Sequence, residues 1–213
     1  MSGRLKIIIK VVGAISTNCI ILINNETKEA VIVDPGDDEP AISQELLKES
    51  AVPAAVLLTH AHFDHILAAG TIRDKYHVPV YMSFDEVNLA CSPALNLSEE
   101  FGCKCSVDAD ILVNGGESIE LAGFAFEVIA TPGHTAGSVC FYIREENVLL
   151  SGDTLFHESV GRTDFPTSST AQIISSVQNK LMKLPDETDV YPGHGQMTEI
   201  GWERHNNPIM FYN

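Results

Sequence analysis

Short runs of β-branched residues alternate with a helix-like stretch along the first quarter of the chain. Three such runs, separated by turn residues, predict a meander of strands: Leu5–Val12, Cys19–Ile23 and Ala30–Val33. Residues Glu39–Ser50 follow with apolar side chains at helical spacing. Ala54–Thr59 is then a continuous apolar run, which is typical of a strand buried on both faces. The pattern predicts a sheet with a helix packed against it.

The rest of the chain repeats this mixture. Ile66–Lys75 has a helical pattern, Val78–Met82 predicts a strand, and Phe84–Ala90 is compatible with a helix, but no clear element follows before Asp110. Ala171–Leu184 is the clearest amphipathic helix. The further predicted strands are Ser118–Leu121, Phe124–Ala130, Ser138–Ile143, Asn147–Leu150 and Asp189–Tyr191. Two sheets packed face to face, with helices outside, satisfy this order, so the expected fold class is α/β.

Length and composition favour one folded domain spanning residues 1–213. Hydrophobic residues make up 45% and charged residues 20%, and 13 Lys+Arg against 29 Asp+Glu give a formal net charge of −16. Such acidity disfavours nucleic acid and membrane partners, because phosphates and anionic lipids are repelled. The chain has no targeting segment and no apolar window of the roughly 18 residues that a spanning helix needs, so we expect a cytoplasmic protein. Its oligomeric state stays open.

A dense group of metal-ligand residues follows the predicted strand Ala54–Thr59. His60, His62, Asp64 and His65 lie within six residues, although the chain has only eight histidines. In an extended or tightly turning segment, a spacing of two lets side chains converge, whereas on a helix it would separate them. Imidazole and carboxylate groups are ligands of zinc, iron and manganese. The group therefore indicates a metal site.

Further candidate ligands occupy three glycine-containing turns, each directly after a predicted strand. The candidates are His134, Asp153 and His194. Glycine allows the chain to turn sharply beside an ion. One Pro-Gly-His turn is weak support, but three such turns after the histidine cluster strengthen the prediction of a shared site at strand ends.

In order and spacing, these motifs resemble the metallo-β-lactamase superfamily. The motifs are Thr-His-x-His-x-Asp-His at 59–65, Pro-Gly-His-Thr at 132–135, Gly-Asp-Thr-Leu-Phe at 152–156 and Pro-Gly-His-Gly at 192–195. The resemblance implies an αββα sandwich of two mixed sheets with a dinuclear site at one edge. It assigns His60, His62 and His134 to one metal and Asp64, His65 and His194 to the other. Asp153 would bridge two divalent ions, zinc first, with iron or manganese also compatible.

That arrangement implies a hydrolase in which a water between two cations becomes hydroxide near neutral pH and attacks a carbonyl carbon. The expected catalytic residues are Asp64, which could orient the nucleophile or move its proton, and the bridging Asp153. Asp34 resembles an early aspartate of the family and is expected to fix a histidine or the ligand loop. A turn-forming role before Pro35 is its alternative.

Within the superfamily, the segment Gly152–Pro166 resembles the glyoxalase II-like branch, which implies hydrolysis of a hydroxyacylglutathione such as S-D-lactoylglutathione or a similar small thioester. The glutathione site is not carried over, because full-length glyoxalase II has a C-terminal helical domain and only about twenty residues follow His194 here. Arg162 is the one cation expected near the substrate, with a structural ion pair as its alternative. His157 is a further candidate for the pocket, while His77 and His205 are expected on the surface or in packing.

Two other functions remain open. A persulfide dioxygenase of the same superfamily would use one iron held by two histidines and an aspartate. A non-catalytic metal-binding protein would keep the fold without activity. The complete set of seven ligands and Pro166 after Phe165 favour hydrolysis.

Overall fold

Two six-stranded sheets form the centre of the molecule in the computed structural model, which describes residues 3–212. Residues 1, 2 and 213 of the expected domain lie outside the described part. The first sheet has the order β1 (Leu5–Val12), β2 (Thr17–Asn24), β3 (Glu29–Val33), β4 (Val52–Leu57), β5 (Val80–Ser83) and β6 (Ile111–Val113). Its first three strands pair antiparallel and the others parallel, so the sheet is mixed.

The second sheet comes from the C-terminal half. Its order is β14 (Thr198–Glu199), β13 (Asp189–Pro192), β10 (Val148–Gly152), β9 (Val139–Ile143), β8 (Phe124–Ala130) and β7 (Ser118–Leu121). Only β10 and β13 pair in parallel. A small hairpin of β11 (Leu155–Phe156) and β12 (Ser159–Val160) follows β10.

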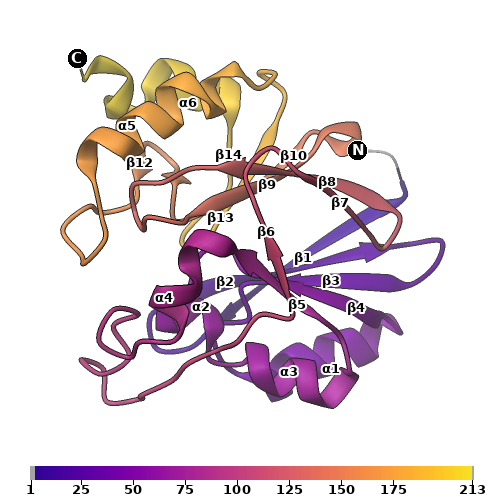
Figure 1. The fold of residues 1–213 in the computed structure, drawn as a ribbon. Coiled ribbons are helices and arrows are strands. Elements are labelled where there is room, and N and C mark those ends of the chain that lie inside the picture. Colours follow the sequence, from indigo (N-terminus) through magenta and orange to yellow (C-terminus); the bar gives the residue numbers. More distant parts are fainter. Residues whose placement is uncertain (1–2, 213) are drawn as a thin grey trace.

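Helices cover both outer faces of the two sheets (Figure 1). Below the first sheet lie α1 (Glu39–Glu49) and α3 (Ala69–Tyr76), and above the second lie α5 (Thr170–Asn179) and α6 (Ile200–Asn206). The remaining short helices are α2 (Phe63–Ile66), α4 (Val87–Ala90), η1 (Phe84–Glu86), η2 (Arg144–Glu146), η3 (Leu181–Lys183) and η4 (Pro208–Phe211). The expected αββα sandwich of two mixed sheets is confirmed.

The apolar core has three layers, and β2 shows why its inner residues 19–23 are all apolar. Ile21 and Ile23 pack in the layer between the first sheet and the helices α1 and α3, whereas Ile20 and Leu22 pack in the layer between the two sheets. Successive side chains of a strand point to opposite faces, so a strand covered on both sides needs apolar residues at every position. The third layer lies between the second sheet and α5.

The structure differs from the predicted helices at two places. The predicted helix Ile66–Lys75 is divided, because α2 ends at Ile66 and the amide of Ala68 donates to Pro35 O, at 3.0 Å, before α3 begins. The helix predicted to reach Leu184 ends at Asn179, because Lys180 leaves helical geometry (φ −120°, ψ −64°). The side chain of Lys180 donates to Ala130 O. No helix among residues 3–212 is long and apolar enough to cross a membrane.

Candidate metal centre

Five of the seven predicted ligands lie in loops that leave strand ends, and Asp64 and His65 lie in the short helix α2 that follows the first of these loops. His60 and His62 follow β4, His134 follows β8, Asp153 follows β10 and His194 follows β13. The first sheet therefore supplies the early ligand cluster and the second sheet supplies the three later ligands. Loops on a rigid scaffold are a common place for functional groups, and here two sheets bring their loops to one edge.

The first ligand set is buried and compact. Ligand atoms of His60, His62 and His134 lie within 4.8 Å of one another. His62 Nδ1 and His134 Nε2 are 2.9 Å apart. The other nitrogen of His134, Nδ1, lies 2.9 Å from the backbone oxygen of Arg162. A proton on Nδ1 can be donated to that carbonyl, which leaves Nε2 with the lone pair that a metal needs.

The second ligand set lies beside the first and is partly exposed. Asp64, His65 and His194 offer ligand atoms within 4.8 Å of one another. His194 Nε2 is 3.2 Å and His65 Nε2 is 3.5 Å from Asp64 Oδ2. Two imidazoles and one carboxylate with their ligand atoms this close together suit zinc, iron or manganese.

Asp153 lies between the two sets. Its Oδ2 is 3.5 Å from His134 Nε2 of the first set and 3.6 Å from His194 Nε2 of the second. Its Oδ1 is 3.5 Å from His65 Nε2. One carboxylate therefore reaches ligand nitrogens on both sides, which is the geometry expected of a residue that bridges two ions.

Asp34 holds two of the ligand histidines in orientation. Its Oδ2 is 3.0 Å from His65 Nδ1 and accepts from the hydroxyl of Thr59 at 2.6 Å, while Oδ1 accepts from the Thr59 amide at 2.8 Å. The Thr59 oxygen is in turn 3.2 Å from His60 Nδ1. Asp34 thus contacts the back of one histidine in each set, directly for His65 and through Thr59 for His60, as a supporting carboxylate does at metal sites.

Unpartnered buried atoms show that the donor set fits metal ions. Among the described residues, the Nε2 atoms of His60, His62 and His65 and the Oδ1 atom of Asp153 are buried without a hydrogen-bond partner. Buried polar atoms normally have partners, because leaving one unpaired costs about 1–3 kcal/mol. Four such atoms at one place, all of ligand type, match a site that divalent ions would satisfy.

Burial and charge set the protonation of these rings. Burial, followed by neighbouring histidines, lowers the pKa of His60 and brings that of His62 to about 3, so both rings are neutral ligands at pH 7. Burial also opposes a charge on His65, but Asp64, Asp153 and Asp34 outweigh it and raise its pKa to about 10. Without metal, His65 therefore carries the proton that neutralises part of this acidic cluster.

Two residues that sequence reasoning did not single out fasten the second ligand set. The hydroxyl of Thr17, at the start of β2, donates to Asp64 Oδ2 at 2.8 Å. The amide of Asn18 donates to Gly193 O at 2.7 Å, and its side chain donates to Pro192 O and Gly195 O at 3.0 Å each. These hydrogen bonds attach the first sheet to the loop that carries His194. In the sequence, the signal for these two residues was the polar pair Thr17-Asn18 at the start of an otherwise mainly apolar strand.

Glu86 is a third residue that the sequence did not reveal. It is 1% exposed and lies in η1. Its Oε2 accepts from the Ala61 amide at 2.8 Å, and its Oε1 accepts from the Thr135 hydroxyl at 2.7 Å and the Gly137 amide at 2.8 Å. One buried carboxylate therefore joins the loop of His60 and His62 to the loop of His134, which together carry the whole first ligand set.

Close backbone approach explains the glycine before His194. A Cβ atom on Gly193 would lie 2.3 Å from Asp153 Oδ1 and 2.7 Å from His65 Cε1. Any side chain there would push against the bridging carboxylate. Glycine at position 193 therefore leaves room for Asp153 and His65, two ligands from other segments of the chain.

A cleft of about 360 Å³ opens over the ligands. His62, Asp64, His134, Asp153 and His194 line it. Apolar side chains and one cation complete its walls, namely Ile15, Phe63, Leu97, Phe101, Phe156, Phe165 and Arg162. Arg162 lines this cleft and also makes an ion pair with Asp164, and its contact with a substrate stays a prediction.

The other candidate histidines lie elsewhere. His157 does not line the cleft within the described part of the chain, so its expected place in the pocket is wrong. Its ring instead stacks on Trp202, with centroids 6.0 Å apart, and its Nδ1 is 3.3 Å from the Thr198 hydroxyl oxygen. The β11–β12 hairpin turns this residue toward α6 and β14. His77 and His205 are exposed, as expected.

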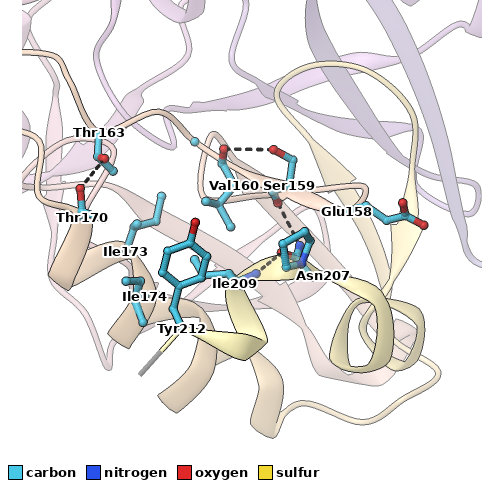
Figure 2. Close-up of a pocket in the computed structure, with 12 residues that line it drawn as sticks. Glu158, Ser159, Val160, Thr163, Thr170, Ile173, Ile174, Asn207, Ile209 and Tyr212 are labelled. Carbon is cyan, nitrogen blue, oxygen red and sulfur yellow. Dashed lines mark hydrogen bonds between the residues drawn. The ribbon is translucent and has the colours of Figure 1, made fainter.

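A second hollow, of about 230 Å³, lies between the β12 loop, α5 and the C-terminal segment (Figure 2). Ile173, Ile209 and Tyr212 form part of its lining, and the hydroxyls of Thr163 and Thr170 bond to each other beside it at 2.7 Å. None of the seven candidate ligands lines this hollow in the described structure. The larger cleft, which five of them line, is therefore the candidate active site.

Comparison with known proteins agrees with this geometry. The family model described as "Metallo-beta-lactamase superfamily" matches residues 12–194. A probable metallo-hydrolase of Bacillus subtilis is 36% identical, covering 93% of this chain and 94% of that protein. A hydroxyacylglutathione hydrolase of Haemophilus influenzae is 34% identical over 93% of this chain and 95% of its own length.

A solved structure described as the BLEG-1 B3 metallo-β-lactamase is 41% identical, with a TM-score of 0.92, covering 97% of this chain and 100% of that one. The residues matched by the family model, 12–194, include all seven candidate ligands. With its αββα sandwich and its two ligand sets at one edge, this chain belongs to the metallo-β-lactamase superfamily.

Proposed function

We propose that this protein is a metallo-hydrolase that cleaves small thioesters with hydroxide formed between two divalent ions, zinc being the first candidate. The position of Asp153 carries this proposal, since its carboxylate lies within 3.5–3.6 Å of ligand nitrogens from both sets. A single shared carboxylate supports two adjacent ions better than one isolated ion.

When bound, the two ions would lower the pKa of a shared water to near neutrality and stabilise negative charge on the scissile carbonyl oxygen. The chain's own residues hold the reacting groups. Asp64 accepts from Thr17 and contacts His194, so its carboxylate is fixed at the cleft. Burial opposes its ionisation, but His65 and these hydrogen bonds outweigh burial and lower its pKa. A carboxylate that stays ionised suits orienting the attacking water more than storing its proton.

Thioesters suit this site because a thiolate is a good leaving group. Water adds its oxygen to the carbonyl carbon and the carbon–sulfur bond breaks, with the electron pair leaving on sulfur. The products are a carboxylate and a thiol, and one proton passes to solvent. The relative from Haemophilus influenzae is named a hydroxyacylglutathione hydrolase, which makes S-D-lactoylglutathione the reference substrate to test.

The test uses the full chain loaded with zinc, iron or manganese in turn, and follows thiol release from S-D-lactoylglutathione and neutral thioesters. We expect metal-dependent turnover with two ions per chain. Asp153→Ala should lose at least about 100-fold in kcat/KM, since removing one key catalytic interaction costs about 2.7 kcal/mol or more. His205→Ala, exposed and outside the cleft, should retain normal turnover. Near-native activity of Asp153→Ala would refute the bridging role.

Other activities give different results in the same assays. One iron per chain together with oxygen uptake on glutathione persulfide would indicate a dioxygenase. The likeness to a structure described as a B3 metallo-β-lactamase makes β-lactam hydrolysis a second candidate, so a β-lactam belongs in the panel. Fully loaded protein without any turnover would indicate a non-catalytic metal-binding protein.

We also propose that the partner is a small molecule in the cytoplasm. The formal net charge of −16 opposes binding to nucleic acid and to anionic membrane surfaces.

A further inference from the structure

The cleft is continuous with another hollow beside the metal ligands, distinct from the one in Figure 2. This hollow, of about 180 Å³, is here called the side groove. The cleft and the side groove share Ile15, Phe63, Asp64 and Phe101 as lining residues. Because Asp64 belongs to the second ligand set and lines both hollows, a substrate held over the metals can extend past Asp64 into the side groove.

The large side chains in the walls of the side groove are apolar, namely Ile15, Phe63, Leu67 and Phe101. The ring of Phe101 stacks on that of Phe63, with centroids 4.6 Å apart and an interplanar angle of 29°. Phe101 is 59% exposed and Ile15, on the β1–β2 turn, is 38% exposed. Large apolar side chains left exposed around one hollow are a usual sign of ligand contact, since their burial is favourable.

The wall that carries Phe101 is anchored to the metal site. Phe101 belongs to the irregular segment between α4 and β6. Asn96 of this segment is fully buried, and its backbone oxygen accepts from the amide of Phe63, the first residue of α2, at 2.9 Å. The Asn96 side chain accepts from Ser98 N at 3.0 Å and donates to Cys105 O at 2.9 Å. The segment is therefore fixed directly to the helix that holds Asp64.

The side groove has no basic side chain among its described lining residues. Arg162 is the only Lys or Arg among the described residues that line either hollow. Its guanidinium makes two hydrogen bonds to Asp164, at 2.8 and 2.7 Å, and lies 4.2 Å from the centroid of the Phe165 ring. The charged residues that line the side groove are Asp37 and Asp64, both acidic. Asp64 is a proposed metal ligand, so in the metal-loaded protein a carboxylate in the side groove would face the uncompensated charge of Asp37, with no Lys or Arg among the described lining residues to oppose it.

We infer that the side groove binds an uncharged, apolar group attached to the scissile thioester, so the protein favours neutral thioesters over those of glutathione. This inference rests on the proposed thioesterase function and specifies its substrate class. A glutathione moiety carries more carboxylates than ammonium groups, and no described residue that lines the groove balances that excess. An apolar group instead gains from burial against Phe63, Phe101 and Ile15.

Two thioester series test the inference and separate the two halves of the substrate. In the first, the lactoyl group is constant and the thiol is glutathione, N-acetylcysteamine or phenylmethanethiol. In the second, the thiol is N-acetylcysteamine and the acyl group is acetyl or phenylacetyl. We expect the neutral lactoyl thioesters to exceed the glutathione thioester at least ten-fold in kcat/KM. If the aromatic group raises kcat/KM further in the first series, the thiol half lies in the groove. If it does so in the second series, the acyl half lies there.

Variants locate the effect in the groove. Phe101→Ala should lower kcat/KM by about ten-fold for the preferred aromatic thioester and by less than about two-fold for the acetyl thioester. Phe84→Ala is the matched control, because Phe84 is also 59% exposed but lines neither hollow. Arg162→Ala should leave the ratio between neutral and glutathione thioesters unchanged. A glutathione preference that Arg162→Ala abolishes would overturn the inference.

A binding measurement separates failure of the inference from failure of the proposed function. Titration calorimetry would compare the non-hydrolysable thioethers S-benzyl-N-acetylcysteamine and S-benzylglutathione on metal-loaded protein. Tighter binding of the neutral thioether, weakened by Phe101→Ala, supports the groove assignment even if no thioester turns over, in which case only the proposed function fails. Equal or tighter binding of the glutathione thioether overturns the groove assignment, whatever the turnover.

Discussion

Single buried carboxylates organise the ligand residues. Asp34, 2% exposed, contacts His65 directly and His60 through Thr59, and its backbone has a positive φ of 49°. Asp tolerates this left-handed conformation better than most residues, so geometry and chemistry both favour it here. Its resemblance to an early family aspartate suggested the supporting role, and the turn-forming alternative stays a prediction, since no turn is assigned at residues 34–36.

Replacing Asp34 should weaken metal binding without removing a ligand. Asp34→Asn keeps the shape but withdraws the negative charge opposite His65 Nδ1, and such supporting substitutions typically cost about 10–100-fold in metal affinity. The affinity would be measured by competition with a chromophoric chelator. Asp37→Asn, three residues away and outside both ligand sets, is the control. Equal affinities of wild type and Asp34→Asn would contradict the orienting role.

Glu86 should act on the first ligand set alone. It joins the loops of His60, His62 and His134, but none of its hydrogen bonds reaches a loop that carries only second-set ligands. Glu86→Gln should therefore weaken the first metal more than the second in stepwise titrations, and lower the free energy of unfolding by about 1.5–3 kcal/mol.

Glu203→Gln provides a matched comparison. Glu203 is also fully buried and accepts from Glu158 N, Thr198 Oγ1 and Asn207 Nδ2, but it lies near the C-terminus, away from the ligands. Its substitution should destabilise the fold to a similar extent and leave both metal affinities unchanged. If the two variants lose metal equally, Glu86 has only a structural role.

At the scale of elements, the irregular segment between α4 and β6 has the clearest functional consequence. Asn96 joins it to α2, and Phe101 extends from it over the cleft. Asn96→Ala should lower the free energy of unfolding by about 1–3 kcal/mol, because buried partners lose their hydrogen bonds. Hydrogen exchange should then speed up at residues 97–105, whose bonds to the Asn96 side chain are lost, whereas the backbone bond from Phe63 to Asn96 is kept.

Asn114→Ala, an exposed position bonded to Glu117, should change neither quantity. Faster exchange spread evenly over the molecule after Asn96→Ala would contradict a local anchor.

Most elements could be predicted from sequence, and the failures have physical causes. Apolar runs identified strands such as β2 and β4, because both of their faces are covered. The short strands β6 and β14 and the helix α6 were missed, since their few residues carry little periodicity and form through contacts with distant segments. The ligands were visible as motifs. Thr17, Asn18 and Glu86 were not, because their role depends on which loops fold together.

For the whole molecule, metal ions should join the two sheets. His60, His62, Asp64 and His65 belong to the half that forms the first sheet, and the other ligands belong to the second. Ions held by both halves bind the folded state and not the unfolded chain, so they stabilise by about 2.7 kcal/mol at a concentration 100 times Kd. For a chain of this size, that corresponds to a rise in Tm of roughly 5–10 °C.

Chelation should reverse this rise, which calorimetry with and without metal would measure. The rise in Tm caused by metal binding should also become larger as pH increases. His65 of the metal-free protein has a pKa of about 10, so its protonated form contributes stability that is present at low pH and is lost as pH rises through that value. Metal must displace this proton, so its affinity increases over the same range. A Tm that does not respond to metal at any pH would refute the claim that metal ions link the two sheets.

The central claim is that one edge of the sandwich holds two ions with Asp153 between them. The most direct measurement is a crystal structure of the fully metal-loaded chain with anomalous scattering recorded at the metal absorption edge. We predict two peaks about 3.5–4 Å apart, one among His60, His62 and His134 and the other among Asp64, His65 and His194, each in contact with Asp153. A single peak at full loading, with Asp153 bound to one ion only, would contradict this account.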